Sequence, residues 1–178
     1  AKGSRASTIF IVEKGMPGFK VGRALDKTGW RSSDTAELIF EDCRVPAENV
    51  LGEENRGFYS IMANFQTERL VIGAMAMAEA REAIRLTFDH VSQRTAFVKP
   101  LWDKQAIRQR LSRRLAEVEA ARQLVHHTAW LDAQGADCVA QVSMVKALAG
   151  DLVNEVLYDC VQFHGGVGFV RETPVERM

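Results

Sequence analysis

The sequence is poor in cysteine, and its few cysteines are not arranged as a metal site or a disulfide framework requires. Cys43, Cys138 and Cys160 are far apart and odd in number, and no two of them form a CxxC pair. A zinc knuckle and a disulfide-stapled fold are therefore not expected. A reducing compartment is the natural setting for free thiols, so we expect a cytoplasmic protein, or one of the mitochondrial matrix if the source is eukaryotic.

The histidines provide no metal site either. His126 and His127 are adjacent, so on a helix they point to different faces. Cys160 and His164 are four residues apart and could share one face, but two ligands are too few for a structural zinc ion. We predict no bound metal.

The chain also lacks an excess of either charge and any long apolar run. Its 23 Lys and Arg balance 23 Asp and Glu, whereas nucleic-acid-binding domains usually carry a basic patch. No apolar stretch reaches the roughly 20 residues of a membrane span, and the richest one, residues 70–78, is short and rich in alanine. No signal peptide precedes the first apolar segment. We therefore expect neither a nucleic-acid partner nor a membrane span.

Two periodicities are present, and together they predict an α+β fold that is mainly α. In residues 1–54, short runs rich in β-branched and aromatic residues alternate with Pro and Gly turns. These runs predict strands at 8–13, 19–22 and 36–42. So small a sheet would bury little surface by itself.

From about residue 55 onward, apolar residues recur at helical spacing. The pattern predicts three long helices, at about 56–93, 102–134 and 137–164. The apolar stripe of the second helix is Leu111, Leu115, Val118, Ala121 and Val125. Long helices with short connections predict an antiparallel bundle, and a fourth helix is expected beyond Met178 or from a partner chain. The absence of an initial Met and the loop at the other end suggest a piece of a longer protein.

Residues 93–100, Gln-Arg-Thr-Ala-Phe-Val-Lys-Pro, follow the first predicted helix. Arg94 and Lys99 place two cations beside a helix break, and Arg forms forked, charge-assisted hydrogen bonds to phosphate. The structural alternative is that cations favour helix C-termini in general. Spacing alone favours that alternative.

Residues 162–168, Gln-Phe-His-Gly-Gly-Val-Gly, end the third predicted helix. Gly165 and Gly166 would let a ligand approach the backbone closely, although a helix stop followed by a loop needs the same residues. No strand precedes the glycines, so the dinucleotide fingerprint of a Rossmann fold is excluded.

Residues 66–69, Gln-Thr-Glu-Arg, lie in the first helix just before the apolar run. A carboxylate at the edge of an apolar surface loses solvation, which raises its pKa and suits it to act as a general base. The alternative is a solvated helix face, because Glu68 and Arg69 are adjacent and do not face each other.

These segments, taken in order, resemble the acyl-CoA dehydrogenases. Residues 8–13, 29–38, 40–46 and 49–52 resemble the family's middle β-domain, and residues 93–100, Gln105, 162–166 and 174–177 resemble its helical C-terminal domain. The resemblance covers essentially the whole chain. It implies part of a middle β-barrel in residues 1–54 and a C-terminal helical bundle, truncated at its end, in residues 55–178.

The resemblance implies an FAD-dependent oxidoreductase that desaturates an acyl-CoA thioester to the enoyl-CoA. A carboxylate takes the α-proton while hydride leaves for flavin N5, and fixed hydrogen bonds polarise the thioester carbonyl. The FAD-binding residues it implies are Arg94, Phe97, Gln105, Gln162, Phe163, His164, Gly165 and Gly166. Val98 stands where the family usually has Gly.

The resemblance also implies a candidate base. In the long-chain and isovaleryl branches the base lies on the first bundle helix just before an arginine, the position of Glu68 here. In most other members it lies in a C-terminal loop that would fall beyond Met178. Gln66, Thr67 and Arg69 would line the acyl-CoA pocket, and the sequence around residues 158–162 looks nearest to the long-chain branch.

The partners implied are a homodimer or homotetramer, in which the adenosine–diphosphate half of FAD reaches a neighbouring subunit, and an electron-transfer flavoprotein. Two other functions fit the same sequence. One is an acyl-CoA oxidase or related flavoprotein, which hands electrons to oxygen. The other is a non-catalytic helical assembly module.

Overall fold

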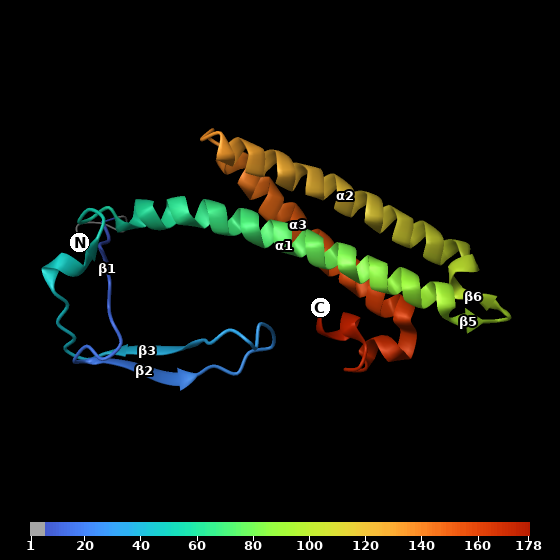
Figure 1. Ribbon diagram of the computed structural model, residues 1–178, viewed down its shortest axis with the longest axis horizontal. Helices are drawn as coiled ribbons and strands as arrows, with labels where there is room; N and C mark the ends of the chain where they lie inside the picture. Colours follow the sequence, from blue (N-terminus) through green and yellow to red (C-terminus); the bar gives the residue numbers. More distant parts are fainter. Residues whose placement is uncertain (1–5) are drawn as a thin grey trace. The chain divides into compact units, whose positions relative to one another are not determined.

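The computed structural model describes residues 6–178, and the chain divides into two compact units, one ending at Asn64 and the other running from Phe65 to Met178. The first unit holds short strands and the beginning of a long helix, and the second is helical (Figure 1). The prediction of a mainly helical α+β chain is confirmed. The strands of the described residues form three separate two-stranded sheets.

The first unit contains two of these sheets. β1 (Ile9–Phe10) pairs with β4 (Val50–Leu51), and β2 (Phe19–Ala24) pairs with β3 (Ala36–Phe40) through a register shift between Val21 and Ala24. The strand predicted at 8–13 is shorter than expected. Beyond Phe10, Ile11 pairs with Asn49 of the 3-10 turn η1 (Ala47–Asn49), which precedes β4. The Ile11 N–H still donates to the Asn49 carbonyl at 2.8 Å, but the Ile11 carbonyl accepts from the Asn49 Nδ2 amide at 2.8 Å because the Asn49 N–H donates to Pro46 within the turn.

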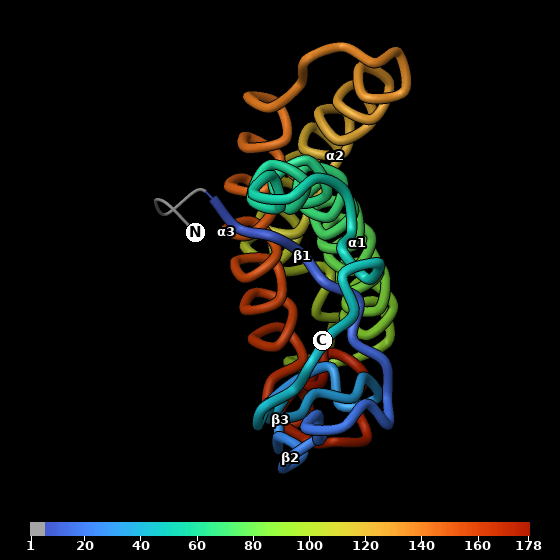
Figure 2. Tube along the Cα trace, turned by 90° about the vertical axis from the view of Figure 1, so that its left-hand side faces the viewer, coloured from blue at the N-terminus to red at the C-terminus, as the bar shows by residue number. Residues whose placement is uncertain are grey.

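The second unit is built on three long helices. α1 (Gly57–Gln93) begins in the first unit, and α2 (Gln105–Ala133) and α3 (Val139–His164) follow it, all close to the predicted positions. A hairpin of β5 (Thr95–Ala96) and β6 (Lys99–Pro100), then the turn η2 (Leu101–Asp103), connects α1 to α2. The turns η3 (Gly165–Phe169) and η4 (Pro174–Arg177) complete the chain. In the second unit the three helices lie side by side (Figure 2).

The buried core joins all three helices, with residues such as Met77, Val118 and Val156 less than 2% exposed. Four members of the predicted stripe on α2 are buried: Leu111, Val118, Ala121 and Val125. The prediction for Leu115 is wrong, because this side chain is 40% exposed. It faces a cavity between α1 and α2, described below, and not the contact with α3. Within residues 6–178, no helix is both long and apolar enough to cross a bilayer.

Gly73 sets the distance between α1 and α3. A Cβ built at this buried position would collide with Cγ1 of Val145, a side chain stiff at χ1. Gly150 on α3 is the matched opposite: among the described residues, and apart from its own helix backbone, a Cβ built there would have only the flexible Lys146 Nζ within 4 Å, at 3.7 Å. A glycine is therefore required at residue 73 and merely tolerated at residue 150.

Gly73→Ala is expected to destabilise the helical unit by about 1 kcal/mol, because overpacking of about 1–3 kcal/mol outweighs a gain in helix propensity of about 1 kcal/mol. Gly150→Ala should instead stabilise it by about 0.5–1 kcal/mol. Urea unfolding followed by helical circular dichroism measures both. Adding Val145→Ala to Gly73→Ala should restore part of the loss, and stabilisation by Gly73→Ala alone would contradict the assigned contact.

α2 and α3 are also joined by a buried ion-pair network around Asp159. Its Oδ2 accepts from Nε of Arg110 at 2.9 Å and from Nε of Arg114 at 2.7 Å. The Asp159 and Arg114 side chains are 5% and 13% exposed. Arg114 Nη1 also donates to Glu117 and Glu155. Burial alone would raise the pKa of Asp159, but the hydrogen bonds from the two arginines outweigh it and hold that pKa below its ordinary value.

Candidate functional site

A cavity of about 570 Å³ opens where α1 and α3 end. It brings together segments that are far apart in the sequence. The lining residues are His90, Arg94, Leu101, Ile107, Gln162, Phe163, His164, Gly165, Gly166 and Val167. Arg94 and residues 162–166, which the sequence singled out separately, therefore line one cavity, which is called the Arg94 cavity below.

The glycines give this cavity an open backbone wall. Gly165 ends α3 with φ 62° and its N–H donates to the Gln162 carbonyl. Apart from adjoining residues, no atom of residues 6–178 lies within 4 Å of a Cβ built at Gly165 or Gly166. At Gly168, by contrast, a Cβ would meet the Val161 carbonyl oxygen at 2.6 Å. Gly168 therefore serves packing, whereas Gly165 and Gly166 leave their backbone accessible to a ligand.

Arg94 is the cation of this cavity. Its backbone N–H donates to the His90 carbonyl at 2.9 Å, just beyond the end of α1, and its side chain is exposed. In the part of the chain that the structure describes, no carboxylate forms an ion pair with it. An exposed guanidinium beside an open backbone wall suits an anionic ligand, above all a phosphate.

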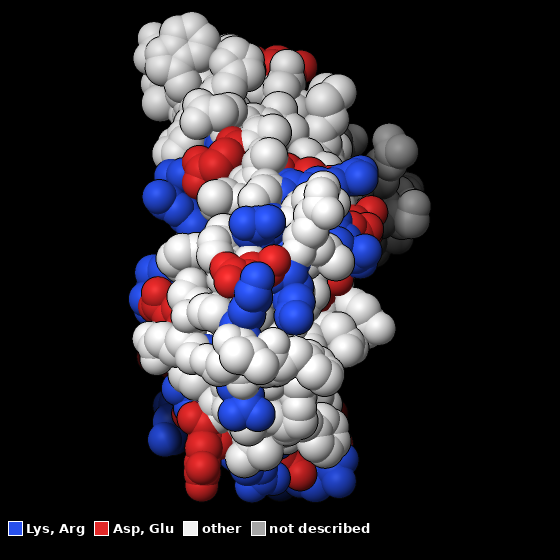
Figure 3. All heavy atoms as spheres, turned by 90° about the vertical axis from the view of Figure 1, so that its right-hand side faces the viewer, with Lys and Arg blue, Asp and Glu red and all other residues white. Residues whose placement is uncertain are grey.

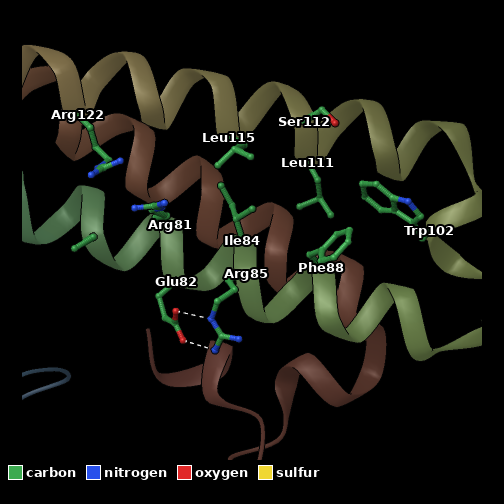
Figure 4. A pocket seen from close by; sticks show the side chains of 11 residues that line it. Arg81, Glu82, Ile84, Arg85, Phe88, Trp102, Leu111, Ser112, Leu115 and Arg122 are labelled. Carbon is green, nitrogen blue, oxygen red and sulfur yellow. Dashed lines mark hydrogen bonds and ion pairs between the residues drawn. The ribbon is translucent and has the colours of Figure 1, made fainter.

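A second cavity, of about 620 Å³, lies between α1 and α2 (Figure 4). Its apolar floor includes Phe88 and Trp102, whose rings meet edge to face with centroids 4.8 Å apart. Its three arginines pair with carboxylates: Arg85 with Glu82 at 2.6 Å, and Arg81 and Arg122 with Glu119 at 3.4 and 2.6 Å. The second cavity thus lacks an unpaired cation like Arg94. On the face of the molecule shown in Figure 3, Lys and Arg side chains are interspersed with Asp and Glu. No broad positive surface would therefore attract an anion on that face, and anion binding would depend on the geometry of individual sites.

Glu68 lies on α1, far from the Arg94 cavity. The helical rise of about 1.5 Å per residue puts Glu68 and Arg94 roughly 39 Å apart along the axis. Glu68 is exposed, so the partial burial expected of it is not present in this chain. Beyond it on the same helix face lie the exposed apolar side chains Val71, Ile72 and Met75.

The polar residues next to Glu68 in the sequence differ in their burial and contacts. The Gln66 Oε1 atom is buried and has no hydrogen-bond partner among residues 6–178. The Arg69 guanidinium lies 6.0 Å from the centroid of the Phe65 ring. Arg69 also borders a hollow of about 360 Å³ with Ser143, Lys146, Ala147, Gly150 and Asp151 of α3. Thr67 is exposed.

The Arg94 cavity holds two histidines in contact. The rings of His90 and His164 stack with centroids 4.3 Å apart and planes at 22°. His164 is 8% exposed, and its Nδ1 lies 2.9 Å from the Cys160 carbonyl oxygen. Burial, then the charges of His164 and Arg94, lower the pKa of His90. No group of three or more His, Cys, Asp or Glu side chains that could hold a metal ion occurs among residues 6–178.

The family model of the acyl-CoA dehydrogenase C-terminal domain matches residues 55–178, which is more than half of the chain. The chain belongs to the acyl-CoA dehydrogenase family. An acyl-CoA dehydrogenase of Bacillus subtilis (strain 168) is 40% identical over 177 residues, covering 99% of this chain and 47% of the relative. The mitochondrial long-chain specific acyl-CoA dehydrogenase of Sus scrofa is 40% identical over 176 residues, covering 96% and 40%.

The fold agrees. Butyryl-CoA dehydrogenase from Megasphaera elsdenii superposes on this chain with a TM-score of 0.94 at 38% identity, covering 99% of this chain and 46% of that one. The predicted resemblance to acyl-CoA dehydrogenases is therefore confirmed. The chain spans about half the length of the relatives it matches.

Two of the acyl-CoA dehydrogenase residues expected at FAD do not line the Arg94 cavity. Phe97 is 88% exposed at the tip of the β5–β6 hairpin, 5.3 Å below the Lys104 ammonium, and Gln105 is exposed at the start of α2. Val98, where the family usually has Gly, has φ 73°. That left-handed conformation is strained for a β-branched residue, which explains why Gly suits the position.

Sequence reasoning missed three residues of the cavity, His90, Leu101 and Ile107, and it included Val167 in the segment 162–168 without assigning it to FAD. Helical spacing could have predicted His90, because it precedes Arg94 by four residues and so lies on the same helix face. Leu101 and Ile107 carry no chemical signal and are placed there only by the path of the chain through the hairpin and η2.

Proposed function

We propose that this chain is the C-terminal part of an FAD-dependent acyl-CoA dehydrogenase, which converts an acyl-CoA thioester to the enoyl-CoA. The observation that carries the proposal is the Arg94 cavity. There a guanidinium without a carboxylate partner in the described chain faces an open glycine backbone contributed by a distant segment. Membership of the acyl-CoA dehydrogenase family makes the FAD diphosphate the ligand that best fits this pairing.

The residues of the cavity fit that ligand. Arg94 is suited to donate charge-assisted hydrogen bonds to the diphosphate, and Gly165 and Gly166 leave room for it along the backbone. Gln162 offers an amide, and Phe163 and His164 offer flat surfaces to the adenine side. Phe97 and Gln105 lie on the hairpin and at the start of α2, and we propose that they complete the same half of the site from outside the cavity.

In this proposal the two functional regions of α1 contact two FAD molecules, one bound by each of two neighbouring subunits. Glu68 and Arg94 are separated by roughly 39 Å along the helix, farther than one extended FAD molecule reaches. The Arg94 cavity would therefore hold the adenosine–diphosphate half of a neighbouring subunit's FAD, while Glu68 faces the subunit's own flavin. A homodimer or homotetramer follows from this sharing.

The acyl-CoA side is assigned to the region around Glu68. Val71, Ile72 and Met75 offer an exposed apolar stripe to the acyl chain. Gln66 supplies a buried acceptor oxygen without a partner among the described residues, Arg69 supplies a cation beside the α3 hollow, and Thr67 supplies an exposed hydroxyl. Covering this surface with substrate would also remove the water around Glu68, which favours proton transfer to it.

The role of this chain in the reaction follows from those groups. The Glu68 carboxylate accepts the α-proton, and the electron pair of that C–H bond becomes the new double bond as hydride leaves the β-carbon. FAD, when bound, supplies the hydride acceptor at N5. The apolar stripe and Arg69 hold the acyl-CoA so that its α-carbon lies next to Glu68.

The wider assembly follows the same proposal. Residues 1–54 would contribute to a middle β-barrel and residues 55–178 to a helical bundle, and an electron-transfer flavoprotein would accept the electrons. The compartment would be the cytoplasm of a bacterium or the mitochondrial matrix of a eukaryote. An acyl-CoA oxidase would differ in one observable, the steady production of hydrogen peroxide with acyl-CoA. A non-catalytic assembly module would have no need of Arg94 and the open glycines together.

Arg94→Gln is expected to raise the Kd for FAD about 10–100-fold, since hydrogen bonds to charged groups contribute about 1.5–3 kcal/mol. Flavin fluorescence measures the release of FAD from the flavin-loaded protein. Arg81→Gln is the control, because Arg81 lies on the same helix but pairs with Glu119 in the other cavity. Equal FAD affinity in wild type and Arg94→Gln would remove this cavity from the FAD site.

A further inference from the structure

His90 has no role in the function proposed above, and its stacking on His164 in the Arg94 cavity is not explained by that function. His90 comes from α1 and His164 from α3, and both line the cavity beside Arg94. The cavity thus holds one cation, the Arg94 guanidinium, and two titratable imidazoles close together. A pair of imidazoles stacked at 4.3 Å cannot easily hold two positive charges unless an anion compensates them.

The hydrogen-bond geometry fixes where a proton can be gained. A carbonyl oxygen only accepts, so His164 Nδ1, 2.9 Å from the Cys160 oxygen, carries a hydrogen. In the neutral ring its Nε2 therefore lacks one. His90 is half-buried, and the pKa of its imidazole is lowered by burial, by His164 and by Arg94, so an anion that offsets the neighbouring positive charge would favour its protonated form.

Among residues 6–178, no other charged side chain lines the cavity. η2 contributes Leu101, α2 contributes Ile107, and η3 contributes glycines and Val167, so none of the lining residues is a carboxylate. On α3, burial raises the pKa of the Cys160 thiol to about 11, which keeps it neutral. Asp159 binds Arg110 and Arg114 instead. An anion in this cavity would thus meet Arg94 and the histidine pair alone.

We propose that His90 and His164 form a proton-linked anion clamp, in which the stacked pair takes up one proton when a diphosphate-bearing ligand binds beside Arg94. The inference rests on the proposed function, in which that ligand is the FAD of a neighbouring subunit. The sign follows from linkage. A group that binds its proton more tightly in the complex makes the ligand bind more tightly as pH falls. Cofactor retention would therefore strengthen toward acid and weaken toward alkali.

ADP-ribose is the probe, because it carries the adenosine–diphosphate half of FAD with both phosphates esterified, and these phosphates do not titrate near neutrality. NMR of the 178-residue chain follows the histidine rings and the Gly165 and Gly166 amides during titrations at several pH values. With ADP-ribose bound, the titration midpoint of His90 should rise by about one pH unit, and affinity should tighten about tenfold between about pH 8 and pH 5.5. His126 and His127 on α2 are internal controls, whose ring signals should not respond to ADP-ribose.

His90→Gln should remove the tenfold pH dependence of the ADP-ribose affinity between about pH 8 and pH 5.5. His127→Gln, which alters a histidine stacked on Trp130 far from the cavity in sequence, should change neither. If the glycine amides shift with ADP-ribose but the His90 midpoint does not, the proton clamp is overturned and the FAD site stands. If the glycine amides do not respond at any pH, both proposals fail.

Discussion

Glu68→Gln in the flavin-loaded protein is expected to slow flavin reduction by acyl-CoA by about 10²–10⁴-fold, the usual contribution of a positioned general base. Gln has nearly the same shape but cannot accept the α-proton. FAD itself should remain bound, because Gln keeps the shape of Glu68 and the diphosphate-binding groups of the Arg94 cavity, roughly 39 Å away along α1, are unchanged. Anaerobic stopped-flow absorbance of the flavin gives the rate, and the unchanged flavin spectrum before mixing confirms that cofactor was retained.

Glu79→Gln is the matched control. Glu79 lies three turns further along α1, on nearly the same face as Glu68, and burial raises the pKa of its carboxyl. That shift by itself suits a general base, so Glu79 is the strongest competitor within this chain. In Glu79→Gln we expect acyl-CoA to reduce the flavin at a rate within about threefold of the wild-type rate. A near-normal rate of flavin reduction in Glu68→Gln would show that the base is another residue. Loss of flavin reduction in Glu79→Gln alone would assign the base to Glu79.

Asp159→Asn is expected to destabilise the helical unit by about 3 kcal/mol, because it removes the shared acceptor of two arginines at a buried position. The value lies at the low end for a broken buried ion pair, since Arg114 keeps Glu117 and Glu155. The corresponding fall in Tm is about 6–12 °C for a chain of this size. Thermal unfolding followed by helical circular dichroism measures it.

The loss should depend on pH in a defined direction. Since the folded-state pKa of Asp159 is lowered, its ionised form stabilises the fold above the unfolded-state value of about 3.9. That contribution disappears as pH falls through the folded-state pKa. The stability difference between wild type and Asp159→Asn should therefore be constant near neutrality and shrink below about pH 4.

Asp89→Asn provides the comparison for a surface pair. Asp89 binds Arg85 at 2.8 Å, but both side chains are more than half exposed. Exposed ion pairs contribute about 0–1 kcal/mol, so this variant should unfold within a few degrees of wild type. Equal losses in Asp89→Asn and Asp159→Asn would show that burial of the Asp159 network does not matter.

The helices were the most predictable part of the fold. Apolar spacing placed all three within a few residues of their observed bounds, because each buries one continuous stripe against the others. The exception, Leu115, faces a cavity between helices, and sequence period alone cannot distinguish a cavity wall from a core contact. Strand 8–13 was overlong because the side-chain hydrogen bond of Asn49 to Ile11 is a contact between distant residues.

The candidate site was predictable only where a residue type carried the signal. Arg94 and the glycines of residues 162–166 were singled out by their chemistry, and the structure brings them into one cavity. His90 shares a helix face with Arg94 but gains its meaning only from the stacked His164 on another helix. Asp159 likewise required the register of α3 against α2, which no local pattern contains.

The most direct test of the central claim is anaerobic addition of acyl-CoA to the wild-type, flavin-loaded protein. A panel of straight and branched acyl-CoA thioesters should include at least one that bleaches the flavin absorbance within seconds and yields the matching enoyl-CoA. That result would establish α,β-dehydrogenation and, by its preferences, the chain length and branching of the substrate. A flavin that stays oxidised with every member of the panel would contradict the proposed function.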